Sequence, residues 1–458
     1  MSSLQRLHGE YARDCVLGVL ERSFTLDITR AGCEFKESIA PQATKLTHST
    51  HSTNSTNSRE STNSRESTNS RESTVEEEED INIGKEKGLE DPKRLEDPKR
   101  LEEPKRLEER LKKWYDHGNV SGFGDVREQV TKVDEDVRRA RDIPSSDFTV
   151  DEWLVQRVAE LWGANFYTGK SNGVRAEPYK IHLYGPGGHF KNHRDTPANG
   201  LVGTFLVGLG DTTSYDYEGL IVNGTSTNAL PGHWVAFYPD VPHKVAKISK
   251  GYRAVLAFKI FRTDAVDPAQ VARTRDVRRK VAEVVAQLRA PVGLLLERRY
   301  CLNTTTFSSF DSVVAQAAKA LPGVTVHQLP VVLHSASSWT PYVEGSWFEA
   351  EYSTAVYPFT SGHIEYLADL SATLGRNRWD KERPYMRGIH TECGAPWLEG
   401  VEDVPFFAFS LARSLETYRN EAHEGAEHIG NESMPERSDS VYLSYVLLVL
   451  PLGTTSEV

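Results

Sequence analysis

The sequence has few cysteines and no long apolar run. Its 458 residues include only Cys15, Cys33, Cys301 and Cys393, and no two of these form a CxxC pair. This spacing argues against a disulfide framework and against a zinc ribbon, so we expect four reduced thiols. The richest apolar stretch, residues 446–450, is far shorter than the roughly 20 residues of a membrane span. We therefore expect an intracellular protein, cytoplasmic or nuclear, with no membrane partner.

An excess of positive charge is also missing. The chain carries 54 Lys and Arg against 65 Asp and Glu, which gives a formal net charge of -11 and a pI near 5.8. A chain this acidic is a poor general binder of nucleic acid, so no nucleic-acid partner is expected, although a local basic patch stays open. The composition is globular, and the length allows two or three ordinary domains.

Apolar residues are absent altogether from one internal stretch, residues 48–74, which contains tandem repeats. The hexapeptide Ser-Thr-Asn-Ser-Arg-Glu begins at Ser55 and recurs twice, and Leu-Glu-Asp-Pro-Lys-Arg begins at Leu89 and recurs once fully and once nearly. The first array cannot bury enough surface to offset the entropy of ordering it, and prolines interrupt helical hydrogen bonding in the second. These features predict an N-terminal segment at 1–45 and a disordered linker at 46–110.

After residue 110 the pattern becomes that of a folded domain. Residues 130–140 are interpreted as a short charged helix, and Thr149 with Glu152 as a capping box that starts the next helix. Beyond Asn172, short apolar runs alternate with Gly, Pro, Asn and Asp turns, which is typical of an antiparallel barrel or sandwich. The expected strands are 179–183, 201–207, 219–222, 233–238, 243–248 and 252–261.

The end of the barrel pattern gives the last domain boundary. Asp267 and Pro268 supply an N-cap and a first-turn proline for another helix, and residues 440–450 read as a final strand. We therefore expect a first folded domain at 111–265 and a mixed α+β domain at 266–458.

A candidate metal site lies within the strand-rich region. His193 and Asp195 are two residues apart, so on an extended strand their side chains would point to the same face. His243, fifty residues later, would complete a set of two histidines and one carboxylate, which leaves open positions on iron, manganese or zinc. Arg253 follows ten residues after it. A buried guanidinium is costly unless it meets an anion, and its planar fork suits a carboxylate.

This ordered set of four residues resembles the iron(II)/2-oxoglutarate-dependent dioxygenases, in particular their prolyl 4-hydroxylase-like branch. Residues 218–220 resemble the glycine-bearing strand between the iron ligands, and residues 230–238 resemble the strand that leads to the distal histidine. Tyr184 occupies the place of a tyrosine that often touches 2-oxoglutarate. The likeness covers roughly residues 148–262.

The resemblance implies a double-stranded β-helix (jelly-roll) catalytic core with flanking helices, within an α+β protein. A degenerate second barrel in the C-terminal half is an open alternative, because some double-domain members of the superfamily have one. His193, Asp195 and His243 would form the catalytic iron(II) site, and Arg253 and Tyr184 would bind 2-oxoglutarate; ascorbate is an optional further cofactor. The implied activity is hydroxylation or oxidation of a protein side chain or a small molecule, with succinate and CO2 as co-products.

Several alternatives stay open at this point. Prolyl 4-hydroxylases of this branch carry lysine where this chain has Arg253, so a prolyl substrate is not implied. His193 and Asp195 could be a structural pair, the triad could hold zinc in a hydrolase, or the domain could be a non-catalytic jelly roll that binds a ligand or a protein. His363 with Glu365 and His390 with Glu392 are also His-x-Glu pairs, and His428 is a possible third ligand. No basic residue is well placed on the final strand for either pair, so a second metal site is not favoured.

Overall fold

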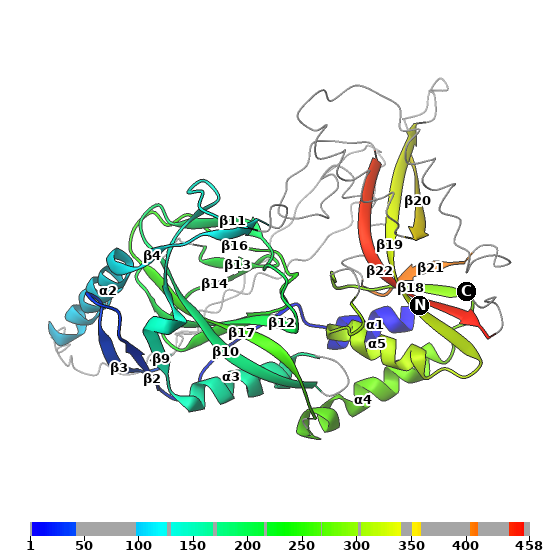
Figure 1. Cartoon of the computed structure of the whole chain (residues 1–458), viewed down its shortest axis with the longest axis horizontal. Coiled ribbons are helices and arrows are strands. Elements are labelled where there is room, and N and C mark those ends of the chain that lie inside the picture. Colours follow the sequence, from blue (N-terminus) through cyan, green and yellow to red (C-terminus); the bar gives the residue numbers. More distant parts are fainter. Residues whose placement is uncertain are drawn as a thin grey trace, which may run out of the picture. The chain divides into compact units, whose positions relative to one another are not determined.

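The computed structural model describes residues 2–42, 98–125, 130–167, 172–214, 218–266, 268–300, 304–339, 350–358, 404–410 and 439–452. Contacts within the chain divide it into two units. One unit comprises Met1–Gln42 together with Pro104–Val458, and the other is Ala43–Glu103. Figure 1 shows the whole chain; the first unit contains two facing sheets in one part and a further sheet with helices in the other.

The largest sheet has seven strands, and all of its pairings are antiparallel. Its order is β1 (Cys15–Val19), β15 (His233–Phe237), β12 (Leu201–Asp211), β17 (Arg253–Val266), β10 (Asn172–Tyr184), β8 (Arg141–Pro144) and β4 (Asn119–Val120). The long strands β10, β12 and β17 form its centre. Phe205 and Phe258 from these strands are fully buried, so this sheet supplies much of the core.

A second antiparallel sheet, of five strands, faces the first (Figure 1). Its order is β14 (Thr225–Thr227), β13 (Leu220–Val222), β16 (His243–Val245), β11 (His189–His193) and β7 (Arg138–Arg139). Val222 and Val245 of this sheet belong to the same hydrophobic core as Phe205 and Phe258. Two facing antiparallel sheets agree with the barrel or sandwich expected from the turn spacing.

Short elements flank these sheets. A three-stranded sheet contains β3 (Phe35–Ile39), β2 (Phe24–Ile28) and β9 (Phe148–Val150), and β5 (Phe123–Asp125) pairs antiparallel with β6 (Val130–Lys132). A single 3-10 turn, η1, spans Ser145–Asp147. The charged helix expected at 130–140 is wrong, because this stretch forms β6 and β7 instead. Pairing of β7 with the distant strand β11 decides the local structure there.

Helix α3 (Glu152–Asn165) begins at a different cap from the one expected. Asp151 is the N-cap, and its side chain accepts a hydrogen bond from the backbone N–H of Leu154. Thr149 lies in β9, so the proposed capping box is wrong by two residues. The buried Trp162 of this helix packs over Gly203 of β12, where an added Cβ would come within 1.8 Å of the indole. The glycine therefore permits close packing of α3 on the outer face of the large sheet (Figure 1).

Helix α2 spans Pro98–His117 and so begins inside the range 46–110 expected to be linker. Its Leu111 and Trp114 are each only 1% exposed and belong to the core of the barrel part. Burial of these side chains outweighs the backbone donor that Pro104 removes. The remaining linker residues, 46–97, lie outside the described residues, so their disorder stays a prediction.

The N-terminal segment is divided between the two parts of the first unit. Strand β1 pairs with β15 at the edge of the seven-stranded sheet, and β2 pairs with β9. Helix α1 (Ser2–Tyr11) instead buries Leu4 and Leu7 in the core of the C-terminal part. Residues 1–42 therefore contribute to both cores and are not an independent segment.

The C-terminal part contains a mixed five-stranded sheet and two helices. The strand order is β20 (Ala350–Pro358), β19 (Val324–Trp339), β22 (Asp439–Pro451), β18 (Val292–Leu295) and β21 (Phe406–Ala408), and only β18 and β21 are parallel. Helices α4 (Pro268–Val285) and α5 (Ser309–Lys319) pack with α1. The helix start at Pro268 and the final strand agree with the sequence pattern.

Two hypotheses about the C-terminal part concern residues that lie largely outside the described ranges. His363, Glu365, His390, Glu392 and His428, the weak second metal site, lie outside the described residues. A degenerate second barrel stays a prediction for the same reason. Within the described ranges, no helix is both long and apolar enough to cross a membrane.

A buried ionic cluster joins the C-terminal part to the turn before β16. The guanidinium of Arg298, 4% exposed, contacts Asp14 and lies 3.5 Å from the Asp240 carboxylate. The backbone N–H of Arg299 also donates to Asp240, at 3.0 Å. Burial of these charges is tolerated because each meets an opposite charge. The turn that leads into His243 is therefore held from outside the barrel.

Candidate metal centre

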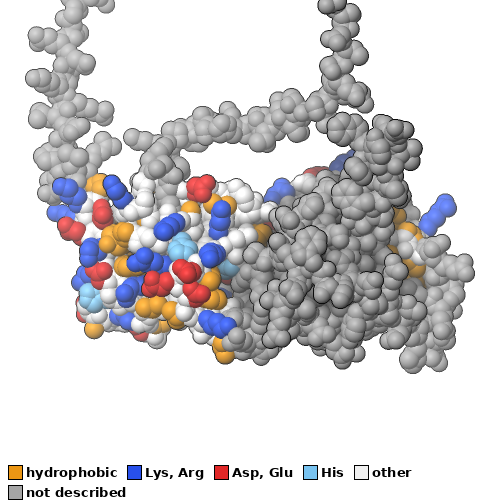
Figure 2. All heavy atoms as spheres, turned by 90° about the horizontal axis from the view of Figure 1, so that it is seen from above, with side chains coloured by type: hydrophobic (Ala, Val, Ile, Leu, Met, Phe, Trp, Pro, Cys, Tyr) orange, Lys and Arg blue, Asp and Glu red, His pale blue; other side chains and the backbone are white. Residues whose placement is uncertain are grey.

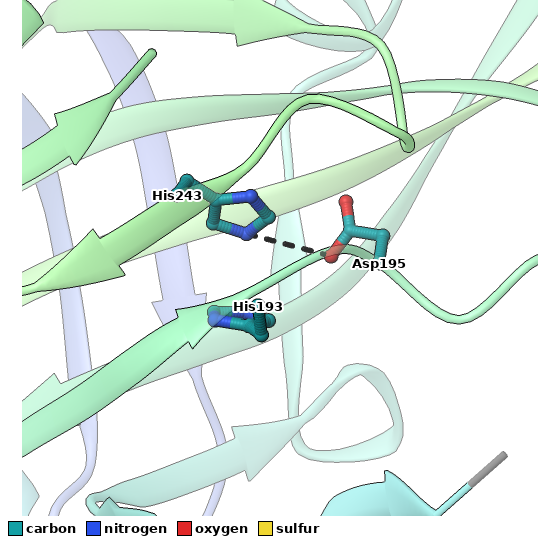
Figure 3. A group of neighbouring side chains, drawn as sticks. All are labelled: His193, Asp195 and His243. Atoms are coloured by element: carbon teal, nitrogen blue, oxygen red, sulfur yellow. Dashed lines mark ion pairs between the residues drawn. The ribbon is translucent and has the colours of Figure 1, made fainter. Parts of the chain in front are cut away.

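The two histidines of the candidate site lie on neighbouring strands of the five-stranded sheet. His193 is the last residue of β11, His243 is the first residue of β16, and the two are direct partners in the antiparallel register. Asp195 follows β11 by two residues, and its backbone N–H donates to the carbonyl of Pro239 at 2.9 Å. One ligand atom from each side chain lies within 4.8 Å of the others (Figure 3). The structure therefore brings together the three residues that the sequence predicted as metal ligands.

Backbone carbonyls fix the tautomer of both imidazoles. The Nδ1 of His193 lies 2.8 Å from the carbonyl of Lys191, and the Nδ1 of His243 lies 2.9 Å from the carbonyl of Val241. A carbonyl can only accept, so each Nδ1 carries the proton and donates it. Each Nε2 then keeps a lone pair for a metal, which is the usual way that a second hydrogen bond orients a ligating histidine.

The Asp195 carboxylate is oriented in the same manner. The hydroxyl of Thr204 on β12 donates to one oxygen, Oδ2, at 2.5 Å. The other oxygen, Oδ1, lies 3.7 Å from the Nε2 of His243, as the dashed line in Figure 3 marks. That separation is longer than a hydrogen bond. The arrangement thus differs from a structural imidazole–carboxylate pair, in which the imidazole nitrogen would donate a hydrogen bond to the carboxylate oxygen.

The surroundings keep His193 neutral. Burial lowers its pKa well below the ordinary value for histidine, and the electrostatic interaction with the neighbouring His243 lowers it further. Phe190 stacks on the His193 ring with centroids 3.5 Å apart, and Phe237 lies 4.6 Å from the His243 ring. Neutral imidazole is the form that binds metal, so this apolar packing prepares the site for an ion.

The three side chains line a cavity of about 380 Å³ between the two sheets. This volume lies within the usual range for sites that bind small molecules. Arg253 and Tyr184, the two residues expected to bind 2-oxoglutarate, also line the cavity and are direct partners in the register of β17 and β10. Arg253 is 2% exposed and Tyr184 is 4% exposed. The structure therefore places all five candidate residues around one space.

Arg253 has a partner that the sequence analysis missed. Its Nη1 donates to the Asp211 carboxylate at 3.1 Å and lies 3.4 Å from the carbonyl of Thr227. Asp211 also accepts hydrogen bonds from the backbone N–H of Ala229 and from both the N–H and the hydroxyl of Thr213. The carboxylate is thus well satisfied and holds one edge of the guanidinium in place.

The other edge of the Arg253 guanidinium matters for cofactor binding. Its Nε is buried and has no hydrogen-bond partner among the described residues. An unpaired buried donor is unfavourable, and a carboxylate in the cavity would satisfy it. The residues present therefore fit a dicarboxylic cofactor such as 2-oxoglutarate. The donor set of two histidines and one carboxylate likewise fits iron, manganese or zinc.

Further polar residues line the cavity that were not predicted as site residues; they include Arg138, Lys180, His182 and Lys259. Arg138 was missed because residues 130–140 were interpreted as a helix. Lys180 and His182 alternate with apolar residues on β10, and that alternation was interpreted as an ordinary half-exposed strand. The available signal was a row of polar residues at period two on the face that also carries Tyr184.

The chain resembles some solved structures but matches no known sequence family. No protein-family model matches the sequence, and no curated protein matches it in a sequence search. Solved structures that resemble it include a prolyl-4-hydroxylase from Pseudomonas putida, with 17% identity over 36% of this chain and 85% of that chain, at a TM-score of 0.23. A prolyl hydroxylase from Trichoplax adhaerens, in complex with a hypoxia inducible factor peptide fragment, has 18% identity over 37% and 81%, at 0.25.

A third similar structure is the viral collagen prolyl hydroxylase of Paramecium Bursaria Chlorella virus-1 in its 2OG complex. It has 13% identity over 28% of this chain and 81% of that chain, at a TM-score of 0.23. At these TM-scores the likenesses carry no argument of their own. The geometry of the triad and of the cavity is therefore what bears on the function of this chain.

Proposed function

We propose that this chain is a non-haem iron(II) and 2-oxoglutarate-dependent dioxygenase built on a double-stranded β-helix. It would hydroxylate or oxidise a protein side chain or a small molecule, with succinate and CO2 as co-products. One observation carries the proposal. The three ligand atoms lie within 4.8 Å of one another beside a cavity that also contains the buried Arg253, whose Nε has no partner in the part of the chain that the structure describes.

Each of the five residues has a defined task in this proposal. His193, Asp195 and His243 hold the iron, and the three leave open positions for other ligands. Arg253, anchored by Asp211, binds the distal carboxylate of 2-oxoglutarate through its free edge, beside Tyr184. When bound, iron and 2-oxoglutarate together supply the oxidation of a substrate C–H bond by dioxygen.

The chain contributes orientation and exclusion of water. The carbonyls of Lys191 and Val241 hold the imidazoles, so each ring has a fixed orientation and a free Nε2 lone pair before any metal binds. Thr204 holds one oxygen of Asp195 and leaves the other facing His243. Preorganised ligands need no rearrangement on binding, and apolar walls limit side reactions with water.

The two alternative functions, a zinc hydrolase and a non-catalytic binding module, each leave features of the site without a role. A zinc hydrolase would use the same triad but would give no role to the free edge of Arg253. A non-catalytic binding module would need neither the fixed tautomers of His193 and His243 nor the oriented carboxylate of Asp195. We therefore treat both as outcomes that an experiment can reveal.

The test loads the full chain with iron(II) and 2-oxoglutarate without oxygen, then admits oxygen and measures succinate. We expect one iron per chain and slow succinate formation even without substrate. His193→Ala should lose both, whereas His233→Ala, which removes an imidazole bonded to the carbonyl of Gln42, should lose neither. Bound iron without any succinate would favour the non-catalytic module. Undiminished iron binding by His193→Ala would overturn the triad.

A further inference from the structure

The cavity carries positive charge at the end away from Arg253. On β17 the residues Arg253, Val255, Ala257 and Lys259 alternate along one face and all line the cavity. Lys259 follows Arg253 by six positions along the strand, which is about 20 Å. Lys259 is the register partner of Thr204, whose hydroxyl holds Asp195. Lys259 therefore lies at the end of the cavity nearest the metal ligands.

Lys259 has no carboxylate partner among the described residues. Its ammonium lies 4.1 Å from the centre of the Tyr179 ring, which is a cation–π contact. Its register partner on β10 is Glu177, but that carboxylate binds Arg175 at 2.8 Å instead. An aromatic ring holds an ammonium in place without neutralising it. The charge of Lys259 is thus positioned and left available.

Arg138 is a second uncompensated cation in the same cavity, and it is more deeply buried. It is 9% exposed, and its guanidinium lies 4.5 Å from the centre of the Phe190 ring that stacks on His193. Its Nη1 donates to the carbonyl of Gly122 at 2.7 Å and its Nη2 to the Nδ1 of His182 at 3.1 Å. All of these partners are neutral. Its Nε has no partner among the described residues.

The neighbouring Lys180 shows what a compensated cation looks like here. Its ammonium lies 3.0 Å from the carboxylate of Asp142, which also accepts a hydrogen bond from Ser121. Nothing comparable is seen for Arg138 or Lys259 within the described ranges. The positive charges act on His182. Burial lowers the pKa of His182 well below its ordinary value, and the charges of Arg138, Lys180 and Lys259 lower this pKa further.

Building on the proposed function, we infer that the substrate carries an oxyanion, a carboxylate or a phosphate, which Lys259 and Arg138 bind beside the metal. Arg138 is buried and Lys259 is half-buried. A cation removed from water is unfavourable unless an anion meets it, so these two cations in one cavity indicate that the ligand supplies the negative charge. The surface seen in Figure 2 is different, because there Lys and Arg side chains lie among Asp and Glu. Unpaired positive charge is thus placed in the cavity.

The oxyanion site formed by Lys259 and Arg138 would discriminate among substrates. A substrate that lacks the oxyanion would bury both cations without compensation, and its binding would be weaker for that reason. Thr204 is the register partner of Lys259 and also donates a hydrogen bond to Asp195. An anion bound by Lys259 would therefore lie close to the metal ligands. Lys259 and Arg138 would therefore select substrates and also orient them.

The test uses inorganic phosphate and acetate as probes of metal-free, full-length protein, titrated by calorimetry at low ionic strength. We expect millimolar binding of at least one anion by the parent protein, and the preferred one identifies the oxyanion class. Lys259→Met keeps the apolar stem but removes the charge, so it should weaken binding about tenfold or more. Lys259→Arg should retain binding. Lys36→Met, which removes an exposed lysine paired with Asp27, should leave it unchanged.

Other outcomes overturn the inference. Absence of binding by the parent would mean that there is no anion site, and equal binding by Lys259→Met and the parent would place any site elsewhere, for example at Arg253. Arg138→Met provides a second, independent variant, with a thermal unfolding scan to establish that it folds. Iron binding and succinate formation are measured separately, so a failed oxyanion site and a failed dioxygenase assignment give different results.

Discussion

Arg253 joins the proposed cofactor site to the stability of the barrel, and replacing it by methionine should affect both. Methionine fills similar space but removes the charge, which leaves the Asp211 carboxylate, 5% exposed, without its cation. Breaking a buried pair by removing one partner typically costs about 3–5 kcal/mol. Asp211 keeps hydrogen bonds from Ala229 and Thr213, so we expect a loss near the lower end of that range.

The effect on 2-oxoglutarate should be separable from the effect on folding. A desolvated bidentate charged pair contributes about 2–4 kcal/mol, so Arg253→Met should raise the apparent constant for 2-oxoglutarate roughly 30- to 1,000-fold. Iron binding should change less, because Arg253 does not contact the ligand triad. Adding Asp211→Asn removes the stranded charge and should restore part of the stability, but not the cofactor affinity.

The assay combines urea unfolding of the metal-free protein with succinate formation at varied 2-oxoglutarate. Arg253→Lys is the matched control, since it keeps the charge but loses the fork and should fall between parent and Arg253→Met. A folded Arg253→Met with the parent's 2-oxoglutarate constant would refute the reasoning about cofactor binding. Unchanged stability would refute the reasoning about Asp211.

Three further predictions concern the triad, the histidines and the repeats. First, Asp195→Ala and His243→Ala should each abolish iron-dependent turnover while the metal-free protein stays folded, as circular dichroism would show; succinate formation at the parent rate by either variant would contradict the triad. Second, His182 and His193 both have lowered pKa values, so below the ordinary histidine pKa of about 6.5 the unfolded state takes up protons that the folded state does not. The free energy of unfolding of the metal-free protein should then fall as pH falls from 7 to 5, by up to about 1.4 kcal/mol per pH unit for each histidine; His182→Gln should reduce the slope, and an equal slope in that variant would contradict the assignment. Third, deletion of residues 46–97 should preserve folding and succinate formation, whereas extending the deletion to 110 removes part of α2 and should lower the unfolding temperature; loss of folding in the shorter deletion would show that the repeats are structural.

The sequence was most informative where the chemistry is local. His193 and Asp195 are two residues apart, and the spacing to His243 and Arg253 is ordered, so the four could be grouped before any fold was known. Asp211 could not be found in this way. Its contact with Arg253 depends on the register of β12 and β17, which shifts by an irregularity between Gly208 and Gly210.

Pairing between distant segments also explains the errors in secondary structure. The stretch 130–140 has a helical composition, but β7 within it pairs with β11, and that tertiary contact decides its structure. Helix α2 continues through Pro104 because Leu111 and Trp114 are buried against the core, which a propensity argument cannot anticipate. Arg138 was missed as a site residue as a consequence of the first error.

The pairing of β1 with β15 has a consequence for synthesis of the protein. Val19 pairs with His233, so at least 214 residues must be added before the N-terminal strand meets its partner. At about 5–20 residues per second, this takes roughly 10–40 s on the ribosome. During that time β1 presents Leu17 and Val19, which stay 43% and 42% exposed even in the folded chain. Of the described strand pairs, β1 and β15 lie farthest apart in the sequence. A nascent chain stalled before residue 233 would therefore expose an unpaired apolar strand to chaperones and to other chains.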